Sequence, residues 1–454
     1  MVFSSLEFIF LFLPLALACV CPLRGRWRVA LLFCVSLVFY AWGGVEYLPL
    51  MLFTVAANFV FGILVARAKR KGAWLAAAVA FNLLLLAFFK YTDPLLSALG
   101  ADPLGISLPI GISFYVFQAL SYVIDVYRGE VGAQKSPLIF GTYVALFPQL
   151  IAGPIVKYRD IEAQLKEARR PCLFEVASGV RTFIAGLCKK VLIANVAGEL
   201  WGHIASLDEK TALLSWFGLI LYAFQIYFDF SGYSDMAIGL GKLLGFHFLE
   251  NFNYPYISKS ITEFWRRWHI SLSSWFRDYL YIPLGGNRKG RWRTYFNLLC
   301  VWTLTGLWHG ASVNFLLWGL YYFALLVIEK TFFRGLLSRL PAPICRAYTV
   351  FFVLIGWLIF AFDSPHEGAE YLRSLLGASG FATLGDVYEL ARNAVFVLIA
   401  VLACTPLPKK LFYRFYEKSR GAAYAALALS LCGFALSVVY LVNSSYNPFL
   451  YFKF

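Results

Sequence analysis

"YFNLLCVWTLTGLWHGASVNFLLWGLYYFALLVIEK", residues 295–330, decides how this chain must fold. From Tyr295 to Ile328 the stretch holds no formal charge, and His309 is its one residue that titrates near neutral pH. Apolar stretches longer than about 18 residues are typical of membrane segments. The stretch therefore predicts a membrane-embedded element with an imidazole near its middle.

The composition extends this prediction to the whole chain. Of 454 residues, 60% are hydrophobic and only 14% are charged, whereas a soluble domain is about 25% charged. Apolar runs of about 20 residues recur from end to end. We therefore expect an all-α polytopic integral membrane protein that forms a single membrane-embedded domain over residues 1–454, with core motifs at about 107–330, C-terminal spans at about 348–442 and an aromatic tail at 447–454.

The net charge of +15 is spread over short loops rather than gathered in one tail or face. Six loops hold 29 of the 40 lysines and arginines, and acidic residues are found in the loops between them. This alternation follows the positive-inside rule, which places the basic loops in the cytoplasm and both termini outside. We expect the bilayer as the partner of these charges, and no nucleic acid. The basic loops cover residues 24–28, 67–71, 157–170, 259–293, 330–346 and 409–420.

The expected spans follow from this alternation. Residues 139–161 are apolar but interrupted by Pro148, Gly153 and Pro154, and they begin and end on the basic side. A re-entrant or interfacial segment fits them better than a crossing, because irregular backbone is not tolerated against lipid. We interpret Met1 to Val20 as a retained first span. The expected spans lie near residues 3–21, 29–43, 48–66, 73–90, 107–127, 174–204, 211–230, 348–362, 388–404 and 421–442, in addition to 295–328.

Several classes of chemistry have no motif in the sequence. The nine cysteines form no CxxC pair, so neither a disulfide framework nor a zinc site is indicated, and we expect no metal. The sequence contains no GxGxxG, P-loop, HExxH or GxSxG motif. We therefore expect no bound cofactor.

Two geometries fit the stretch around His309. A hairpin that enters from the cytoplasm has legs of about 21 and 28 Å and turns at His309-Gly310, inside a hydrocarbon core of about 30 Å. One long bent helix is the other, since Gly306 and Gly310 flank the histidine. Both bury His309 among tryptophans. An ionisable group inside the membrane tends to mark function, and a neutral histidine bonded between helices is the alternative.

A second histidine lies in "TEFWRRWHISLSSWFRDYLYIPLGGNRKGRWR". Projected at about 100° per residue, Glu263 to Leu280 separates into an apolar arc of about 160° and a polar remainder. We predict an amphipathic interfacial helix on the cytoplasmic face, with His269 in the apolar arc and pointing away from water. The apolar arc consists of Phe264, Trp265, Trp268, Leu272, Trp275, Phe276, Tyr279 and Leu280.

Polar residues interrupt the apolar run "YFDFSGYSDMAIGLGKLLGF". Asp229 and Asp235 are too costly to leave unpaired in lipid, so they either cap a broken helix or line a cavity. Ser231 and Tyr233 belong to the same polar group. The spacing supplies too few ligands for a metal site.

Buried histidines without a redox or nucleotide motif point to proton transfer. A neutral imidazole in a cavity of low dielectric can act as a general base toward a hydroxyl group. The hydroxyl then attacks an activated carbonyl, which is acyl transfer. The residues alone indicate this reaction type and no substrate.

Five separated motifs add a resemblance that covers nearly the whole chain. "YFDFSGYSDMAIG", "EFWRRWHISLSSWFRDYLYIPLGG" and "TGLWHGASVNFLLWG" resemble the membrane-bound O-acyltransferase family. The opening "MVFSSLEFIFLFLPL" and the closing "NPFLYFKF" are most similar to its bacterial branch of alginate and other polysaccharide O-acetyltransferases.

The resemblance implies a helical membrane fold around a funnel or tunnel, with re-entrant and interfacial helices. It implies that His309 is catalytic and that His269 supports it. It also implies acetyl-coenzyme A as the cytoplasmic donor substrate, a periplasmic or membrane-anchored O-acetyltransferase partner protein, and an exported polysaccharide as acceptor. The location would be the bacterial inner membrane. Alginate, cellulose, peptidoglycan and other polymers all remain open.

The last residues, "FLYFKF", resemble an aromatic motif proposed to carry the acyl group outward through its tyrosine, here Tyr451. A phenol suits this role because it is both a nucleophile and a fair leaving group. The alternative is an aromatic belt that anchors the end of the last span.

Three other functions compete with acetyl transfer. A transporter is consistent with broken helices and buried polar groups, although no inverted repeat is visible. D-alanyl transfer to teichoic acid is the closer alternative, with a carrier protein as donor, but the motif "FLYFKF" within the chain favours the acetyl branch. A scaffold without catalysis gives no reason to bury both histidines.

Overall fold

The computed structural model describes residues 1–151, 153–444 and 446–450. Every regular element in these ranges is a helix, as the composition predicts. Six helices are long and apolar enough to cross a membrane, and a seventh span is counted if the bent pair Ala394–Ala403 and Leu407–Tyr416 is one crossing. The chain is a multi-pass membrane protein. The six spans are Val45–Arg67, Lys71–Ala98, Ala212–Leu243, Val313–Phe333, Ala342–Ala361 and Arg420–Asn443.

The chain divides into two compact units. Unit 1 comprises Met1–Phe183 and Tyr233–Glu250, and unit 2 comprises Ile184–Gly232 and Asn251–Phe454. The boundaries fall within helices α9 (Leu173–Cys188) and α11 (Ala212–Leu243).

Unit 1 is built on the first spans. An aromatic cluster lies at its core, where the Phe3 ring stacks on Tyr233 with centroids 4.4 Å apart. Two buried asparagines, Asn58 and Asn82, exchange hydrogen bonds of 3.1 and 2.7 Å between α3 and α4, so neither amide is left unsatisfied in the apolar interior. The helices are η1 (Phe8–Phe12), α1 (Leu13–Val20), α2 (Gly25–Ala41), η2 (Val45–Tyr47), α3 (Leu48–Arg67), α4 (Lys71–Ala98), α5 (Ile112–Arg128), α6 (Pro137–Ala145), α7 (Phe147–Leu150) and α8 (Tyr158–Glu167).

The segment expected to be re-entrant is short and buried. Helix α6 has 9 residues, about 14 Å of helix, which is too short for a crossing. It ends at Ala145, and α7 adds four more residues after Leu146. Phe140, Tyr143, Phe147 and Leu150 are fully buried. Residues 151 and 153–157, on the non-helical backbone before α8, are buried too, so these residues pack inside protein and not against lipid.

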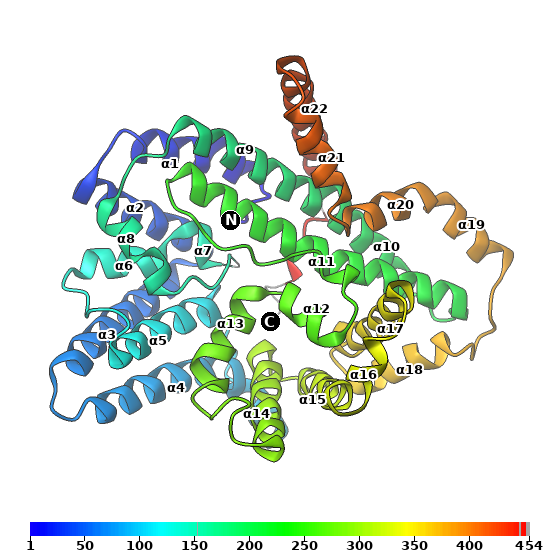
Figure 1. Cartoon of the computed structure of the whole chain (residues 1–454), viewed down its shortest axis with the longest axis horizontal. Coiled ribbons are helices and arrows are strands. Elements are labelled where there is room, and N and C mark those ends of the chain that lie inside the picture. Colours follow the sequence, from blue (N-terminus) through cyan, green and yellow to red (C-terminus); the bar gives the residue numbers. More distant parts are fainter. Residues whose placement is uncertain (152, 445, 451–454) are drawn as a thin grey trace. The chain divides into compact units, whose positions relative to one another are not determined.

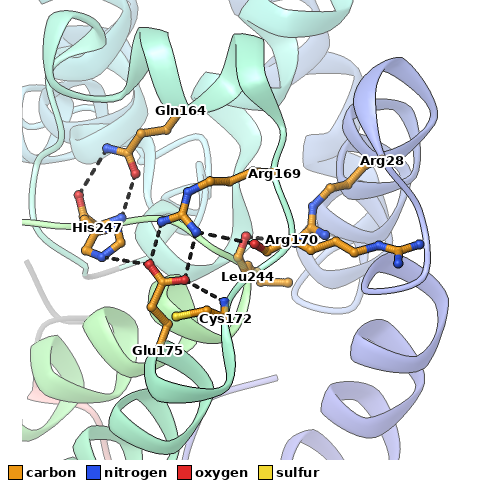
Figure 2. Close-up of polar contacts among 8 residues, drawn as sticks. All are labelled: Arg28, Gln164, Arg169, Arg170, Cys172, Glu175, Leu244 and His247. Atoms are coloured by element: carbon orange, nitrogen blue, oxygen red, sulfur yellow. Dashed lines mark hydrogen bonds and ion pairs between the residues drawn. The ribbon is translucent and has the colours of Figure 1, made fainter.

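A polar network ties the start of α9 to the segment that follows α11 (Figure 2). The Glu175 carboxylate accepts hydrogen bonds from the Arg169 guanidinium and from the Cys172 amide, both at 2.8 Å, and lies 3.2 Å from His247 Nε2. The hydrogen bond from Arg169 is the main reason why the pKa of Glu175 falls to about 2. Gln164 holds the His247 amide at 2.8 Å.

Arg28 was expected in a cytoplasmic basic loop, but the structure buries it. Its side chain is fully buried in unit 1, and its Nη2 donates to the Leu244 carbonyl at 2.9 Å (Figure 2). Burial lowers the pKa of the guanidinium, and the nearby charge of Arg170 adds to this. Arg28 therefore joins α2 to the chain after α11.

Unit 2 holds the remaining helices, among them a hairpin whose two legs lie next to each other in Figure 1. Its hydrophobic core combines aliphatic and aromatic side chains, among them Trp268, Trp318, Trp357 and Phe360. The helices are η3 (Lys189–Asn195), α10 (Val196–Ala205), η4 (Pro255–Ile257), α12 (Ile261–Arg267), α13 (Ile270–Phe276), η5 (Arg277–Tyr281), α14 (Arg291–His309), α15 (Val313–Ile328), η6 (Glu329–Phe333), α16 (Arg334–Leu337), α17 (Ala342–Ala361), α18 (Pro365–Leu375), α19 (Leu384–Arg392), α20 (Ala394–Ala403), α21 (Leu407–Tyr416) and α22 (Arg420–Asn443).

The Glu175 network makes a prediction about stability. Because its folded pKa is depressed, the carboxylate stabilises the fold above its unfolded pKa of about 4.3, and this contribution is lost as the pH falls toward about 2. At pH 7, Glu175→Gln should lower the free energy of unfolding by about 1 kcal/mol, a modest value because Arg169 is partly solvated. Thermal unfolding in detergent at pH 7 and pH 3.5 measures it.

Glu209→Gln, at an exposed loop position, is the matched control and should leave stability unchanged at both pH values. A Glu175→Gln defect of the same size at pH 7 and pH 3.5 would contradict the assigned role of the ionised carboxylate.

Candidate active site

His309 is the last residue of α14, and α15 returns antiparallel to it after a short turn. The hairpin is therefore the correct geometry, and one bent helix is not. Its legs approach closely at two glycines, since a Cβ on Gly306 would lie 2.4 Å from the Phe315 carbonyl oxygen and a Cβ on Gly319 would lie 2.4 Å from that of Trp302. Gly306, the first glycine of the "TGLWHG" motif, is therefore required because any side chain there would collide with the facing backbone.

The ring of His309 is enclosed by aromatic side chains. It is 4% exposed, and its centroid lies 5.2 Å from that of Trp318 and 5.2 Å from that of Phe360, both edge to face. Trp308, its neighbour in sequence, lies 5.0 Å away. These contacts fix the plane of the imidazole in surroundings of low dielectric.

His269 does not lie within a helix. The expected amphipathic helix over 263–280 is broken into α12, α13 and η5, and His269 occupies the first break with left-handed backbone angles of φ 42° and ψ 57°. Its burial was predicted correctly, at 2% exposed. The projection was wrong about continuity because neither Gly nor Pro marks residues 267–270.

Asn251 holds this break in place. Its side-chain oxygen accepts hydrogen bonds from the Ser271 amide at 3.1 Å and the Ser271 hydroxyl at 2.9 Å, and it lies 3.1 Å from His269 Nδ1. Its backbone carbonyl accepts from the Ile270 amide at 2.9 Å. The segment before α12 thus replaces the helical hydrogen bonds that the break removes. Sequence reasoning missed Asn251, which lies 18 residues from His269 with no motif to connect them.

The contact with Asn251 also selects a tautomer for His269. Because an amide oxygen can only accept, Nδ1 carries the proton and the lone pair is on Nε2. Burial lowers the pKa of His269 to about 3. The imidazole is therefore neutral at physiological pH.

Both histidines line one cavity of about 580 Å³ in unit 2. Its walls are mainly aromatic and aliphatic, and two exposed arginines, Arg266 and Arg277, also border it. Trp308 connects the two imidazoles, with its ring centroid 5.0 Å from His309 and 6.3 Å from His269. An apolar cavity with a few converging polar groups is the usual form of a small-molecule site.

Glu329, at the end of α15, is a second residue that sequence reasoning missed. Its buried carboxylate accepts hydrogen bonds from the amides of Ile261 at 2.7 Å and Thr262 at 3.1 Å. A carboxylate at a helix N-terminus satisfies unpaired amides and complements the helix dipole. Glu329 therefore fixes α12, which carries Arg266, to the hairpin that carries His309.

The polar residues Asp229, Ser231, Tyr233 and Asp235 are not among those that line this cavity. Helix α11 is continuous from Ala212 to Leu243, so these residues do not cap a broken helix. The described part of α11 contributes Ile226 to the cavity. Asp229 and Ser231 are buried in unit 2, whereas Tyr233 and Asp235 belong to unit 1. Asp229 pairs with Lys190 at 2.7 Å.

Tyr451 lies outside the described residues. The residues directly before it are inside the protein, however, and not in an exposed belt at a helix end. Phe449 is 5% exposed, and Leu450 packs against the hydrophobic core of unit 2.

The chain is similar in sequence to a known family of membrane proteins. Residues 133–363 match the model of the membrane-bound O-acyltransferase family. The chain is 39% identical, over the full length of both proteins, to a probable alginate O-acetylase of Pseudomonas putida. It is 44% identical over 79% of its length to the counterpart in Pseudomonas aeruginosa, covering 72% of that protein. A peptidoglycan O-acetyltransferase of Helicobacter pylori is 33% identical over 84% of this chain and 80% of its own.

These matches define the class of protein. The chain belongs to the membrane-bound O-acyltransferase family, as its motifs predicted. It is therefore a polytopic membrane enzyme that transfers acyl groups to hydroxyl acceptors.

The low pKa of His269 predicts a dependence of stability on pH. The unfolded imidazole titrates at about 6.5 and the folded one at about 3, so between these values the unfolded state binds the extra proton and stability falls as the pH is lowered. The loss is at most about 1.4 kcal/mol per pH unit. Between pH 7 and pH 5, wild type should lose more thermal stability than His269→Asn. Equal losses in both proteins would contradict a buried neutral His269.

Proposed function

We propose that this protein transfers an acetyl group from acetyl-coenzyme A for the O-acetylation of an alginate-like exported polysaccharide. The likeness to alginate O-acetylases over the full length supports the acetyl group and the class of acceptor. In this proposal the protein is located in the bacterial inner membrane, its termini are periplasmic, and a periplasmic or membrane-anchored partner protein completes the transfer to the polymer.

The observation that carries the proposal is the shared cavity. Two buried imidazoles, His309 at the end of α14 and His269 in the break between α12 and α13, line one apolar space of about 580 Å³. Such a space suits the apolar arm and thioester of the donor, and Arg266 and Arg277 provide cations for its phosphates. A buried site also keeps water away from the thioester.

The proposed reaction uses His309 as the general base. Its neutral imidazole takes the proton of an acceptor hydroxyl as the oxygen attacks the thioester carbonyl carbon. The carbon–sulfur bond of the tetrahedral intermediate then breaks, and the thiolate leaves and takes up the proton as free coenzyme A. The products are one ester and one thiol, and His309 returns to its neutral form.

His269 supports this step. Its Nδ1 proton is donated to Asn251, which leaves Nε2 as a hydrogen-bond acceptor on a side chain that lines the same cavity. An acceptor at that place orients a hydroxyl or thiol donor during transfer. Because burial holds His269 neutral, it does not compete with His309 for the proton.

Tyr451 is the proposed first acceptor. Its phenol oxygen takes the acetyl group from the donor, and the phenyl ester then gives the group to a second hydroxyl outside the cavity, which restores the phenol. Phe449 is buried and the partly buried Leu450 packs against the core of unit 2, which supports a tail that reaches this core.

The catalytic role of His309 is testable on purified protein. His309→Ala should lower coenzyme A release from acetyl-coenzyme A by at least about 100-fold, the usual contribution of a general base. His269→Ala should lower it less, since its role is orientation. The exposed His366→Ala is the matched control and should keep full activity.

Equal release by wild type and folded His309→Ala protein would show that His309 is structural. A transporter would release no coenzyme A at all, even with the partner protein and polymer added, so the same assay separates the two classes.

The role of Tyr451 is tested in cells. Tyr451→Phe removes only the phenol oxygen, so it should abolish polymer acetylation while leaving protein abundance unchanged. Tyr424→Phe, at an exposed position on α22, should have no effect. Normal polymer acetylation in the Tyr451→Phe strain would contradict the relay and leave the aromatic belt as the function of the tail.

A further inference from the structure

A buried ion pair lies halfway along α11, in the middle of a candidate membrane span. The Lys190 Nζ is 2.7 Å from Asp229 Oδ1, and both side chains are 2% exposed. Burying two charges costs several kcal/mol per ion, which their attraction offsets only when further hydrogen bonds satisfy the remaining atoms. The groups that form further hydrogen bonds with Lys190 and Asp229 therefore indicate the function of this pair.

Those partners belong to the C-terminal segment, residues 446–450. Asp229 Oδ2 accepts a hydrogen bond from the Leu450 amide at 2.8 Å. Lys190 Nζ donates to the Pro448 carbonyl and, at 2.8 Å, to Asn195 Oδ1. The Asp229 carboxylate thus accepts from a backbone N–H, and the Lys190 ammonium group donates to a backbone C=O two residues earlier. This is recognition of a peptide by its main chain.

Two side chains extend the contact along the segment. Asn195 Nδ2 donates to Asn447 Oδ1 at 3.3 Å, and Gln225 Nε2 donates to the Tyr446 hydroxyl at 3.2 Å. Gly198 makes room for this, since a Cβ there would lie 2.7 Å from the Tyr446 hydroxyl. Four groups on η3 and α11 therefore hold consecutive parts of one peptide.

The backbone of η3 brings the side chains of Lys190 and Asn195 together. Lys190 and Asn195 are five residues apart within a π-helix, whose hydrogen bonds also join residues five apart. Their side chains therefore meet on one side of the helix. Short π-helices inside longer helices frequently occur at functional sites.

The segment ends against the hydrophobic core of unit 2, and part of that core lines the candidate active site. Phe449 is buried, and Leu450 packs against the hydrophobic core that includes Trp268, Trp357 and Phe360. These three aromatic residues also line the cavity of His269 and His309.

We propose that Lys190, Asn195, Gln225 and Asp229 form an intramolecular peptide-binding site, the tail clamp, which holds residues 446–450 through their backbone and polar side chains. The members of the clamp are positioning residues and not catalytic ones. That the clamped tail receives the acyl group on Tyr451 rests on the function proposed above, whereas the docking of residues 446–450 does not.

The test is amide hydrogen exchange of the peptide that covers residues 444–454, measured on the full chain in nanodiscs. Lys190→Met combined with Asp229→Leu removes both charges without leaving one unpaired, a replacement that buried pairs tolerate. Loss of two charge-assisted hydrogen bonds should speed exchange of this peptide by at least about tenfold, with exchange elsewhere in unit 2 unchanged. Asn195→Leu keeps the ion pair and should give a smaller increase, which tests the clamp independently of the charges.

The control is Asn58→Leu with Asn82→Leu, which removes a buried polar pair from unit 1 and should not alter exchange of the tail. Unchanged tail exchange in folded Lys190→Met/Asp229→Leu and Asn195→Leu proteins would overturn the proposal, as would an equal increase in the control.

A functional readout separates the clamp from the relay. If the clamp and the relay are both correct, polymer acetylation in cells should fall in the Lys190→Met/Asp229→Leu variant. Adding Tyr451→Phe to this variant should then lower polymer acetylation no further. Faster tail exchange with full acetylation would retain the clamp and refute the relay.

Discussion

The hydrogen bonds of Asn251 are the constraint on which the site depends. They hold the chain in a left-handed turn at His269, where a continuous helix would otherwise run from α12 into α13. A non-glycine residue in that conformation costs about 1–2 kcal/mol, and the four hydrogen bonds that the two oxygens of Asn251 accept offset this cost. The turn allows α12 and α13 to take separate directions along the wall of the cavity, with His269 buried between them.

The second support of the site is the close packing of the α14–α15 hairpin. Gly306 and Gly319 bring the two backbones into contact, which places His309 at the end of a rigid pair of helices. Glu329 then ties this pair to the N-terminus of α12. Each imidazole is thus fixed by backbone geometry and by aromatic packing, which suits a site that must hold reacting groups within a fraction of an ångström.

Hydrophobicity and charge were sufficient to predict the membrane class, most of the helices and the burial of both histidines, because each of these depends on local pattern. Around His309 they left a hairpin and one bent helix open, and the contacts of Gly306 and Gly319 identify the hairpin. The break at His269 was not predictable in this way, since the residues around it favour a helix and the group that breaks it is Asn251, distant in sequence. The same holds for Asp229, which pattern alone assigned to a cap or a cavity. Its partners Lys190 and Leu450 lie 39 and 221 residues away.

The proposed transfer of an acetyl group to Tyr451, with His309 as the base, is tested most directly by intact mass spectrometry of purified protein after brief exposure to acetyl-coenzyme A. We expect one added acetyl group, located on Tyr451 by fragmentation of the C-terminal peptide, and its absence in His309→Ala. An unmodified tail in a wild-type protein that releases coenzyme A at full rate would contradict the claim.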